Sequence, residues 1–184
     1  MEADSYKADA SLSHEGEDYA RKMTDRLLEH VSAEKRKLLE LGDSEAAKRP
    51  LIVWTSTRRR TIETAQFLHQ KGYKVRHRSQ MSQLNPGVCE KMSERRIRLE
   101  YPDEVAKHEL DPYHHRYPRA ESYHDLAVRL EPIILELERE RNDLLIIAHE
   151  SVLRVLYGYL MACNAADIPF LSFPRNEIIE VRKP

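Results

Sequence analysis

The hydrophobic positions of this chain form short apolar runs, separated by longer stretches in which apolar residues recur at helical spacing. The runs Leu51–Trp54 and Leu144–Ala148 are continuous and consist of large apolar residues, except for the final alanine of the second run. This pattern is typical of parallel strands that are buried on both faces. Tyr73–His77 carries a weak strand pattern, and Glu177–Arg182 is predicted to be a final strand. The sequence therefore predicts a sheet built from these four segments.

The amphipathic stretches between the runs predict helices with one buried face. Ser151 is predicted to cap the helix that follows the second run, whose apolar face includes Val152 and Val155. Pro132 should bend the helix in which it lies. Strands that alternate with helices favour an α/β fold with a mostly parallel sheet. The predicted helices span Ser13–Leu41, Thr57–Lys71, Ser93–Tyr101, Tyr123–Arg141 and the stretch from Ser151 to Tyr159.

Three polar stretches are predicted to be loops. Gly42–Pro50 connects the first helix to the first apolar run, and Met81–Cys89 contains the turn-forming pair Pro86-Gly87. His108–Arg119 is long, polar and rich in histidine and tyrosine. A loop of this kind inside a compact domain is usually a lid or a binding loop.

Length and charge limit the function classes. The 184 residues suit one domain with a real core. The 30 basic and 31 acidic side chains nearly cancel, so no overall field favours nucleic acid or a membrane as a partner. Two cysteines do not make a disulfide framework, and no apolar run approaches the ~20 residues of a membrane span. With no signal peptide at its start, the chain is expected to be cytoplasmic.

Two junctions between a predicted strand and a predicted helix carry candidate chemistry. His149 follows the run Leu144–Ala148, at the carboxyl end of a strand, where ligands collect in α/β sheets. The arginines 58–60 follow the other run, and we expect a site role for only one of them. Cations and a histidine at neighbouring strand ends would make an anion pocket. Two plainer interpretations remain open, namely a solvated arginine face and a histidine that only hydrogen-bonds locally.

Several motifs together carry a resemblance to a known family. WTSTRRRTIETA, NPGVCEKM, the long stretch from YPDEVAKHELDPYHHRYPRAESYHDLAVRLEP to IILELE, and LLIIAHESVLR resemble the histidine phosphatase (phosphoglycerate mutase-like) superfamily. The similarity is greatest to the fructose-2,6-bisphosphatase domain of the bifunctional 6-phosphofructo-2-kinase/fructose-2,6-bisphosphatase. It runs from about Ala8 to Pro184. It implies a three-layer α/β fold, a mostly parallel sheet with helices on both faces.

The resemblance also implies a mechanism and partners. Members attack a phosphate with the histidine of an Arg-His-Gly motif on the first strand, and water then hydrolyses the phosphohistidine. A second histidine and two arginines hold the phosphoryl group, and a glutamate protonates the leaving oxygen. The implied ligand is a small sugar phosphate, with no cofactor and no metal. An upstream kinase domain is implied for the full-length protein, so residues 1–184 would be a single bisphosphatase-like domain that lacks the family's first strand.

Carried over residue by residue, the resemblance assigns five positions of this chain. His149 matches the second histidine, and Arg60 matches the phosphate-binding arginine after the WTS strand. Arg116, Tyr123 and Arg154 match substrate-binding positions.

The departures from the family pattern are as informative as the matches. Arg-His-Gly does not occur in the chain, and Gln83 stands at the position of the catalytic glutamate. Glutamine does not donate and recover a proton at neutral pH. Glu150 replaces the glutamine that follows the histidine, and a carboxylate there would repel a phosphate. Three sugar-phosphate contacts, a tyrosine, an arginine and a lysine, are replaced by Glu94, His108 and Pro112.

These residues favour a degenerate fructose-2,6-bisphosphatase-like domain of a 6-phosphofructo-2-kinase-type protein, without phosphatase activity of its own. One alternative is a histidine phosphatase that becomes active once the missing strand is supplied. Another is a non-catalytic module that binds a phosphorylated ligand or acts as a scaffold. Glu90 as a replacement acid and a metal site at His108, His114 and His115 are both less favoured than solvated polar side chains.

Overall fold

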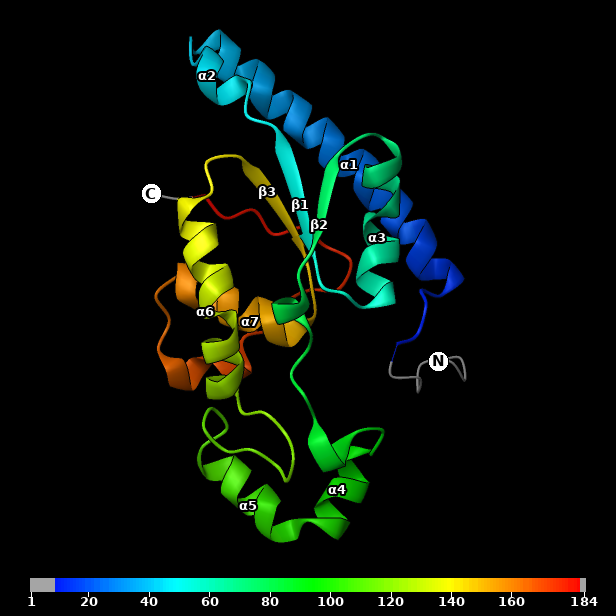
Figure 1. Cartoon of the computed structure of the whole chain (residues 1–184), viewed down its shortest axis with the longest axis vertical. Helices are drawn as coiled ribbons and strands as arrows, with labels where there is room; N and C mark the ends of the chain where they lie inside the picture. The colour runs from blue at the N-terminus through cyan, green and yellow to red at the C-terminus, as the bar shows by residue number, and fades with distance from the viewer. Residues whose placement is uncertain (1–8, 183–184) are drawn as a thin grey trace. The chain divides into compact units, whose positions relative to one another are not determined.

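The computed structural model describes residues 9–182, so the two ends of the predicted domain, residues 1–8 and 183–184, lie outside the described residues. The described residues divide into two compact units, which we treat separately. The first contains residues 9–78, 140–147 and 174–182, and the second contains residues 79–139 and 148–173. The elements of the first unit are α1 (His14–Glu40), α2 (Ser44–Ala47), β1 (Leu51–Thr55), α3 (Arg59–Gln70), β2 (Lys74–His77) and β3 (Asp143–Ile147) (Figure 1). Those of the second are η2 (Ser79–Met81), η3 (Gly87–Cys89), α4 (Glu94–Glu100), α5 (Pro102–Leu110), α6 (Tyr123–Arg139), α7 (Glu150–Leu160) and η4 (Ala165–Phe170).

The first unit is built around a parallel three-stranded sheet with the order β2-β1-β3. β1 pairs with β2 from Ile52–Lys74 to Thr55–His77, and with β3 from Leu51–Asp143 to Thr55–Ile147. All five residues of the central strand β1 are buried, as its continuous apolar sequence predicted. The edge strand β3 is only partly buried, so the prediction that Leu144–Ala148 is buried on both faces was wrong.

Helices α1 and α3 cover one face of this sheet. Met23 and Leu27 of α1 and Leu68 of α3 form a core with Leu51 and Val53. Ile52 and Trp54 point to the opposite face and are also buried, so both faces of β1 are covered. The α/β fold class predicted from the sequence is therefore confirmed.

The long helix α1 begins where its sequence predicted. The side chain of Ser13 accepts a hydrogen bond from the Gly16 N–H, which caps the helix. Acidic residues in its first turn and Lys37 in its last complement the helix dipole. Within the described part of the chain, no helix is both long enough and apolar enough to cross a membrane.

In the second unit, α6 packs on α7, and α7 packs on η4. Leu126, Leu130 and Ile133 of α6 have no exposed surface. Gly158 of α7 lies so close to Ile168 that an added Cβ would stand 2.9 Å from the Ile168 Cγ1 atom. This glycine is therefore needed for the close packing of α7 and η4.

Three predictions about local structure were wrong. The connection Gly42–Pro50 contains the short helix α2, capped by the Asp43 side chain. The predicted loop His108–Arg119 begins inside helix α5, which starts at Pro102. Proline suits the first helical turn, because the N–H that it lacks would have no partner there. Ser151 does not cap α7, since His149 occupies the cap position.

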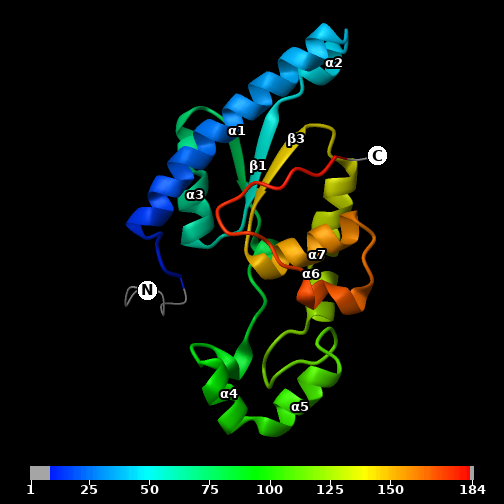
Figure 2. The ribbon, with the colours of Figure 1, turned by 180° about the vertical axis from the view of Figure 1, so that it is seen from behind.

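The predicted final strand Glu177–Arg182 does not form. The segment has no ladder partner, and Figure 2 shows it (red) as a coil without an arrow. Ile178 and Ile179 remain 43% and 44% exposed. A strand pattern forms a strand only when a neighbour takes up its backbone hydrogen bonds.

Candidate functional site

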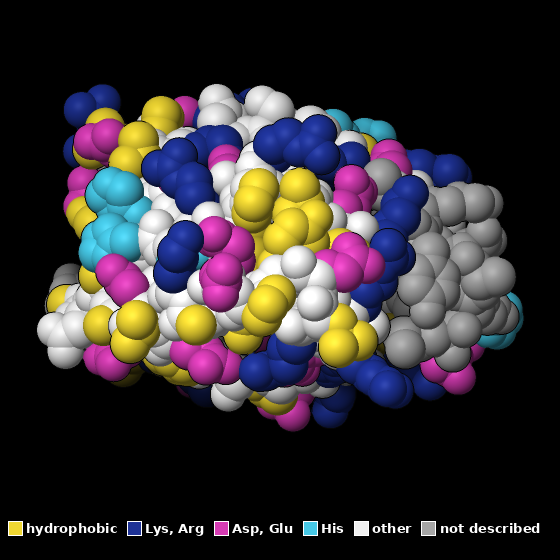
Figure 3. All heavy atoms as spheres, turned by 90° about the horizontal axis from the view of Figure 1, so that it is seen from below, with side chains coloured by type: hydrophobic (Ala, Val, Ile, Leu, Met, Phe, Trp, Pro, Cys, Tyr) yellow, Lys and Arg dark blue, Asp and Glu magenta, His cyan; other side chains and the backbone are white. Residues whose placement is uncertain are grey.

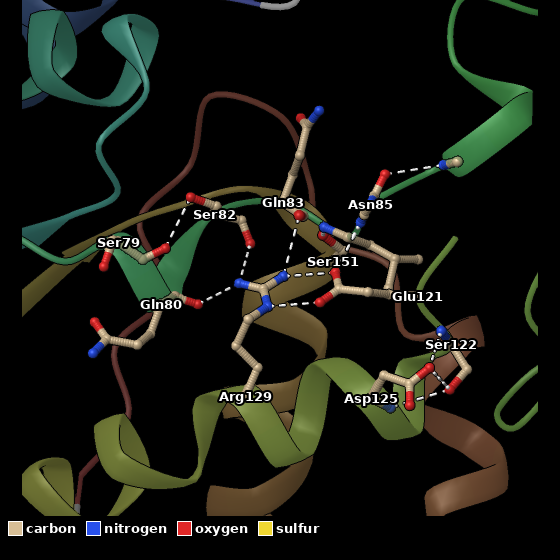
Figure 4. Close-up of polar contacts among 12 residues, drawn as sticks. Ser79, Gln80, Ser82, Gln83, Asn85, Glu121, Ser122, Asp125, Arg129 and Ser151 are labelled. Atoms are coloured by element: carbon tan, nitrogen blue, oxygen red, sulfur yellow. Dashed lines mark hydrogen bonds and ion pairs between the residues drawn. The ribbon is translucent and has the colours of Figure 1, made fainter. Parts of the chain in front are cut away.

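The second unit holds most of the residues that the sequence predicted for the site. The loop before η3 is fixed at three points. The Leu84 N–H donates to the Ser151 Oγ atom at 3.0 Å, and the Asn85 N–H donates to Glu121 at 2.9 Å. The Val88 N–H donates to the Pro118 carbonyl at 3.1 Å. These bonds hold the position of Gln83 beside the start of α7 (Figure 4).

An ion pair beneath this loop was not predicted from the sequence. Arg129 of α6 donates to both carboxylate oxygens of Glu121 at 2.8 Å, and to the carbonyl groups of Gln80, Ser82 and Gln83 (Figure 4). Burial opposes the charged carboxylate, but the bonds from Arg129 and from the Asn85 N–H hold the pKa of Glu121 below its ordinary value. Both residues belong to the stretch YPDEVAKHELDPYHHRYPRAESYHDLAVRLEP, which indicates the family but gives no sign of the ion pair.

Gln83 itself contributes an amide rather than a carboxylate. The backbone carbonyl oxygen of Gln83 accepts from the Arg129 Nη2 atom at 3.2 Å. In Figure 4 the side chain of Gln83 points away from the ion pair. The backbone of Gln83 is thus held by Arg129, while its side chain points in another direction (Figure 4). A glutamate at this position would be presented in the same direction.

His149 lies at the cap position of α7, with extended φ and ψ angles of −83° and 152°. It is 9% exposed, so it is among the buried polar residues. Its backbone carbonyl accepts from the Leu153 N–H at 2.9 Å and begins the helix. The strand-to-helix junction that the sequence predicted is therefore present, and His149 is the N-cap residue of the helix.

Arg154 is one turn further along α7 and uses all its donor nitrogens within the unit. Nε donates to the Leu171 carbonyl at 2.6 Å, Nη1 to the Tyr123 hydroxyl at 2.8 Å and Nη2 to the Glu150 carboxylate at 2.8 Å. Burial alone would lower the pKa of Arg154, but Tyr123 and Glu150 together keep it above its ordinary value. The structure thus brings Tyr123 and Arg154 together, with the non-family Glu150 as the third member.

Arg116 is placed differently. Its side chain is 62% exposed, and it pairs with Asp125 at 3.1 Å. Asp125 in turn accepts from the Ser122 N–H and hydroxyl at the start of α6. Hydrogen bonds to these groups hold the pKa of Asp125 below its ordinary value. Arg116 is therefore a surface cation, oriented by a carboxylate that also organises the helix start.

The histidines of the predicted loop form contacts of their own. The His115 Nε2 atom donates to the Glu104 carboxylate at 2.7 Å, and its Nδ1 atom lies 3.4 Å from the Nδ1 atom of His108. His114 is paired with Asp111 at 3.0 Å, and Figure 3 shows histidine side chains gathered on the surface that it views. Over residues 9–182, no group of three histidine, cysteine or acidic residues has a metal-binding arrangement.

Arg60 belongs to the first unit, in the first turn of α3. It is half-buried, and burial, with the charge of Arg58 acting in the same direction, lowers the pKa of Arg60. Asp9 acts in the opposite direction and accepts from the Arg59 N–H at 2.8 Å. A carboxylate of the chain thus lies at the start of the helix where an anion would otherwise be favoured.

Comparisons with known proteins identify the family. A sequence profile described as the histidine phosphatase superfamily (branch 1) matches residues 32–182. The chain therefore belongs to the histidine phosphatase superfamily. More narrowly, it is a fructose-2,6-bisphosphatase-like member, as its named relatives show.

Two relatives are from Saccharomyces cerevisiae. A protein with the provisional name 6-phosphofructo-2-kinase/fructose-2,6-bisphosphatase is 45% identical, over 97% of this chain and 37% of its own length. A fructose-2,6-bisphosphatase is 37% identical, over 94% of this chain and 34% of its own length. A 6-phosphofructo-2-kinase/fructose-2,6-bisphosphatase of Gallus gallus is 36% identical, over 94% and 33%. The chain thus spans about a third of the length of these relatives.

Solved structures confirm the fold. An α-ribazole phosphatase from Shigella flexneri superimposes with a TM-score of 0.69 at 18% identity, over 92% of this chain and 76% of the other. A mycobacterial glucosyl-3-phosphoglycerate phosphatase in complex with inorganic phosphate superimposes with a TM-score of 0.66 at 20% identity, over 90% and 76%. The phosphoglycerate mutase-like architecture implied by the sequence resemblance is therefore present.

Proposed function

We propose that this chain is a degenerate fructose-2,6-bisphosphatase-like domain, without phosphatase activity of its own, in a protein of fructose 2,6-bisphosphate metabolism. The observation that carries the proposal is the ion pair between Glu150 and Arg154 at 2.8 Å. It places a carboxylate of the chain on a guanidinium that the family pattern assigns to the substrate. The same carboxylate is the neighbour of His149 in the sequence.

The replacement of the acid supports the proposal independently. Gln83 occupies the position at which the family supplies a proton to the leaving oxygen. An amide does not titrate near neutral pH, so it leaves an alkoxide without a proton donor. Loss of a general acid typically removes ~10²–10⁴ in rate. The backbone at this position is nevertheless held in place. Arg129 donates to the Gln83 carbonyl, and the N–H of the next residue, Leu84, donates to Ser151.

The relatives suggest the setting of the domain. Two of the three relatives described above are named as bifunctional kinase and bisphosphatase proteins, and the chain spans about a third of their length. We infer that the full-length protein carries a 6-phosphofructo-2-kinase domain, which would form fructose 2,6-bisphosphate that this domain does not remove. Arg60, His149, Arg116 and Tyr123 would then be the remaining contacts to a sugar phosphate.

Measurement of phosphate release tests the proposal. The purified chain should release phosphate from fructose 2,6-bisphosphate no faster than its His149→Ala variant does. His149→Asn provides a matched control, since it also removes the imidazole but keeps a polar side chain at the cap of α7. Turnover by the wild-type chain that both variants abolish would overturn the proposal.

A second experiment addresses the active-phosphatase alternative. That alternative requires a strand carrying Arg-His-Gly and a proton donor other than Gln83. Two proteins with such a strand added are compared, one with the wild-type residues and one with Gln83→Glu and Glu150→Gln. The double variant should turn over substrate about 10²–10⁴ times faster. If the protein with the added strand but without the substitutions already reaches the rate of an active bisphosphatase, the active-phosphatase alternative is favoured. Sugar-phosphate binding without turnover in any of these proteins would favour the binding-module alternative.

A further inference from the structure

A groove in the first unit lies at the end of β1 opposite to Arg60. Its volume is about 470 Å³, and Leu51, Tyr73 and Asn142 form part of its lining. Leu51 is the first residue of β1, and Asn142 immediately precedes β3. Small-molecule sites typically have volumes of about 300–1,000 Å³, so the groove has room for a metabolite.

Three cations line this groove, and no acidic residue does. Lys35 comes from α1, and Lys74 and Arg76 come from β2. Lys74 and Arg76 alternate with Val75, which packs against the α1–α3 core, so both project from the other face of the strand. Both are exposed, and within residues 9–182 neither has a hydrogen-bond or ion-pair partner.

Lys35 is held in position by the chain itself. Its Nζ atom donates to the Arg49 carbonyl at 2.7 Å, which leaves two N–H donors for another acceptor. The surrounding sequence does not neutralise the three charges, because the stretch from residue 35 to residue 78 contains 12 Lys and Arg but four Asp and Glu. Charges on an exposed edge strand also discourage strand pairing. Protection of the edge strand would explain Lys74 and Arg76, but it does not explain Lys35, which comes from another element.

The chemistry of the lining indicates the class of ligand. A guanidinium and two ammonium groups suit phosphate oxygens. Ile52 is the ladder partner of Lys74, lies on the same face of the sheet and also lines the groove, so it offers apolar surface to an organic group. We propose that this groove binds an organic phosphate carrying at least two phosphate groups, as a site separate from the predicted phosphatase site.

The separation follows from the direction of the strands. The groove lies at the amino ends of β1 and β2, whereas Arg60 follows the carboxyl end of β1. A strand of five residues is about 16 Å long. One small ligand therefore does not contact both the groove and Arg60.

Calorimetric titration with inorganic pyrophosphate and with fructose 1,6-bisphosphate tests the proposal. Each titration uses the wild-type chain and Arg60→Ala, so that binding near α3 is distinguished from binding in the groove. Both probes should bind saturably to both proteins, and the sugar bisphosphate should bind more tightly. Lys74→Glu combined with Arg76→Glu should raise both dissociation constants at least tenfold.

The control is Lys22→Glu combined with Arg175→Glu, which makes the same change in net charge outside the groove. Its dissociation constants should stay within twofold of the wild-type values. The absence of saturable binding, or equal weakening in the control, would overturn the site. Pyrophosphate binding as tight as that of the sugar bisphosphate would overturn the organic part of the assignment.

A labelling experiment avoids the need for variants. Lys35 and Lys74 of the wild-type chain should react more slowly with an amine-acylating reagent when pyrophosphate is present, as measured by peptide mass spectrometry. Lys22 is exposed and provides the internal reference. Equal labelling of Lys74 with and without pyrophosphate would contradict the proposal.

Discussion

At the scale of single residues, carboxylates of the chain lie beside two arginines that the family resemblance assigns to phosphate binding (Arg60) and substrate binding (Arg154). Glu150 pairs with Arg154, and Asp9 accepts from the start of α3 next to Arg60. Each contact depends on one carboxylate, so a single conservative substitution removes it. The two arginines are retained, but their charge is partly used within the protein.

Replacing Glu150 should therefore strengthen anion binding. Glu150→Gln removes the charge that pairs with Arg154, and an exposed pair of this kind contributes about 0.2–1 kcal/mol. The dissociation constant for inorganic phosphate should fall by about 1.4- to fivefold, as measured by calorimetry in the Lys74→Glu/Arg76→Glu background. Glu131→Gln, an exposed site on α6 with the same charge change, is the control. Equal tightening in both variants would mean that net charge alone is responsible.

Loss of the Glu121–Arg129 pair should cost stability rather than binding. Both side chains are mostly buried, with exposed fractions of 23% and 26%. Glu121→Gln leaves the Arg129 charge without its counterion, and an unmet buried partner costs about 1–3 kcal/mol. Urea denaturation should show a loss in this range for Glu121→Gln and almost none for Glu131→Gln. If Glu121→Leu combined with Arg129→Leu is no more stable than Glu121→Gln, the cost does not come from the unpaired charge.

At the scale of elements, α5 carries a histidine whose surroundings disfavour its protonated form. His108 lies half-buried on this helix, with His115, Tyr117 and Glu109 around it. Burial, with the charge of His115 acting in the same direction, holds the pKa of His108 below its ordinary value, and Glu109 opposes this. The folded chain therefore takes up this proton less readily than the unfolded chain does.

Stability should thus fall as the pH falls below the ordinary histidine value of about 6.5. The contribution is fully present above that pH and is lost on approach to the lower folded-state pKa. Thermal unfolding at pH 7.5 and 5.5 should show a larger decrease in Tm for the wild type than for His108→Gln. Glu104, Glu121 and Asp125 do not confuse this comparison, because their lowered pKa values place their titration at more acidic pH. An identical decrease in both proteins would remove His108 as the cause.

At the scale of the whole molecule, the two edges of the sheet differ. β2 carries Lys74 and Arg76, which discourage pairing with another strand. β3 carries one acidic residue followed by four aliphatic ones, and among the described residues its only sheet neighbour is β1. Each unpaired backbone group in an apolar setting costs about 1–3 kcal/mol, against a total stability of about 5–15 kcal/mol.

The isolated chain should therefore be marginally stable and prone to self-association through β3. Size-exclusion chromatography over a range of protein concentrations should show growing oligomers, and thermal unfolding should begin below ~50 °C. The charged edge β2 provides a comparison, since Lys74→Val combined with Arg76→Val should increase the association further. A monodisperse monomer with a cooperative transition above ~50 °C would show that the edge of β3 is sufficiently protected.

The sequence by itself determined two of the strands, the main helices and the family. Leu51–Trp54 and Leu144–Ala148 are continuous apolar runs, and both form parallel strands, but only β1 is fully buried, because β3 lies at an edge of the described sheet. The replacements Gln83 and Glu150 were also readable directly, because they depend only on residue type at a matched position.

Only the tertiary structure decided which local patterns were realised and which side chains met. Glu177–Arg182 has a strand pattern but forms no strand, because a strand requires a hydrogen-bonding neighbour that local sequence does not supply. The three bonds of Arg154 and the Glu121–Arg129 pair join residues distant in sequence, so periodicity gave no sign of them. The groove likewise depends on the tertiary structure, because Lys35 lies on α1 whereas Lys74 and Arg76 lie on β2.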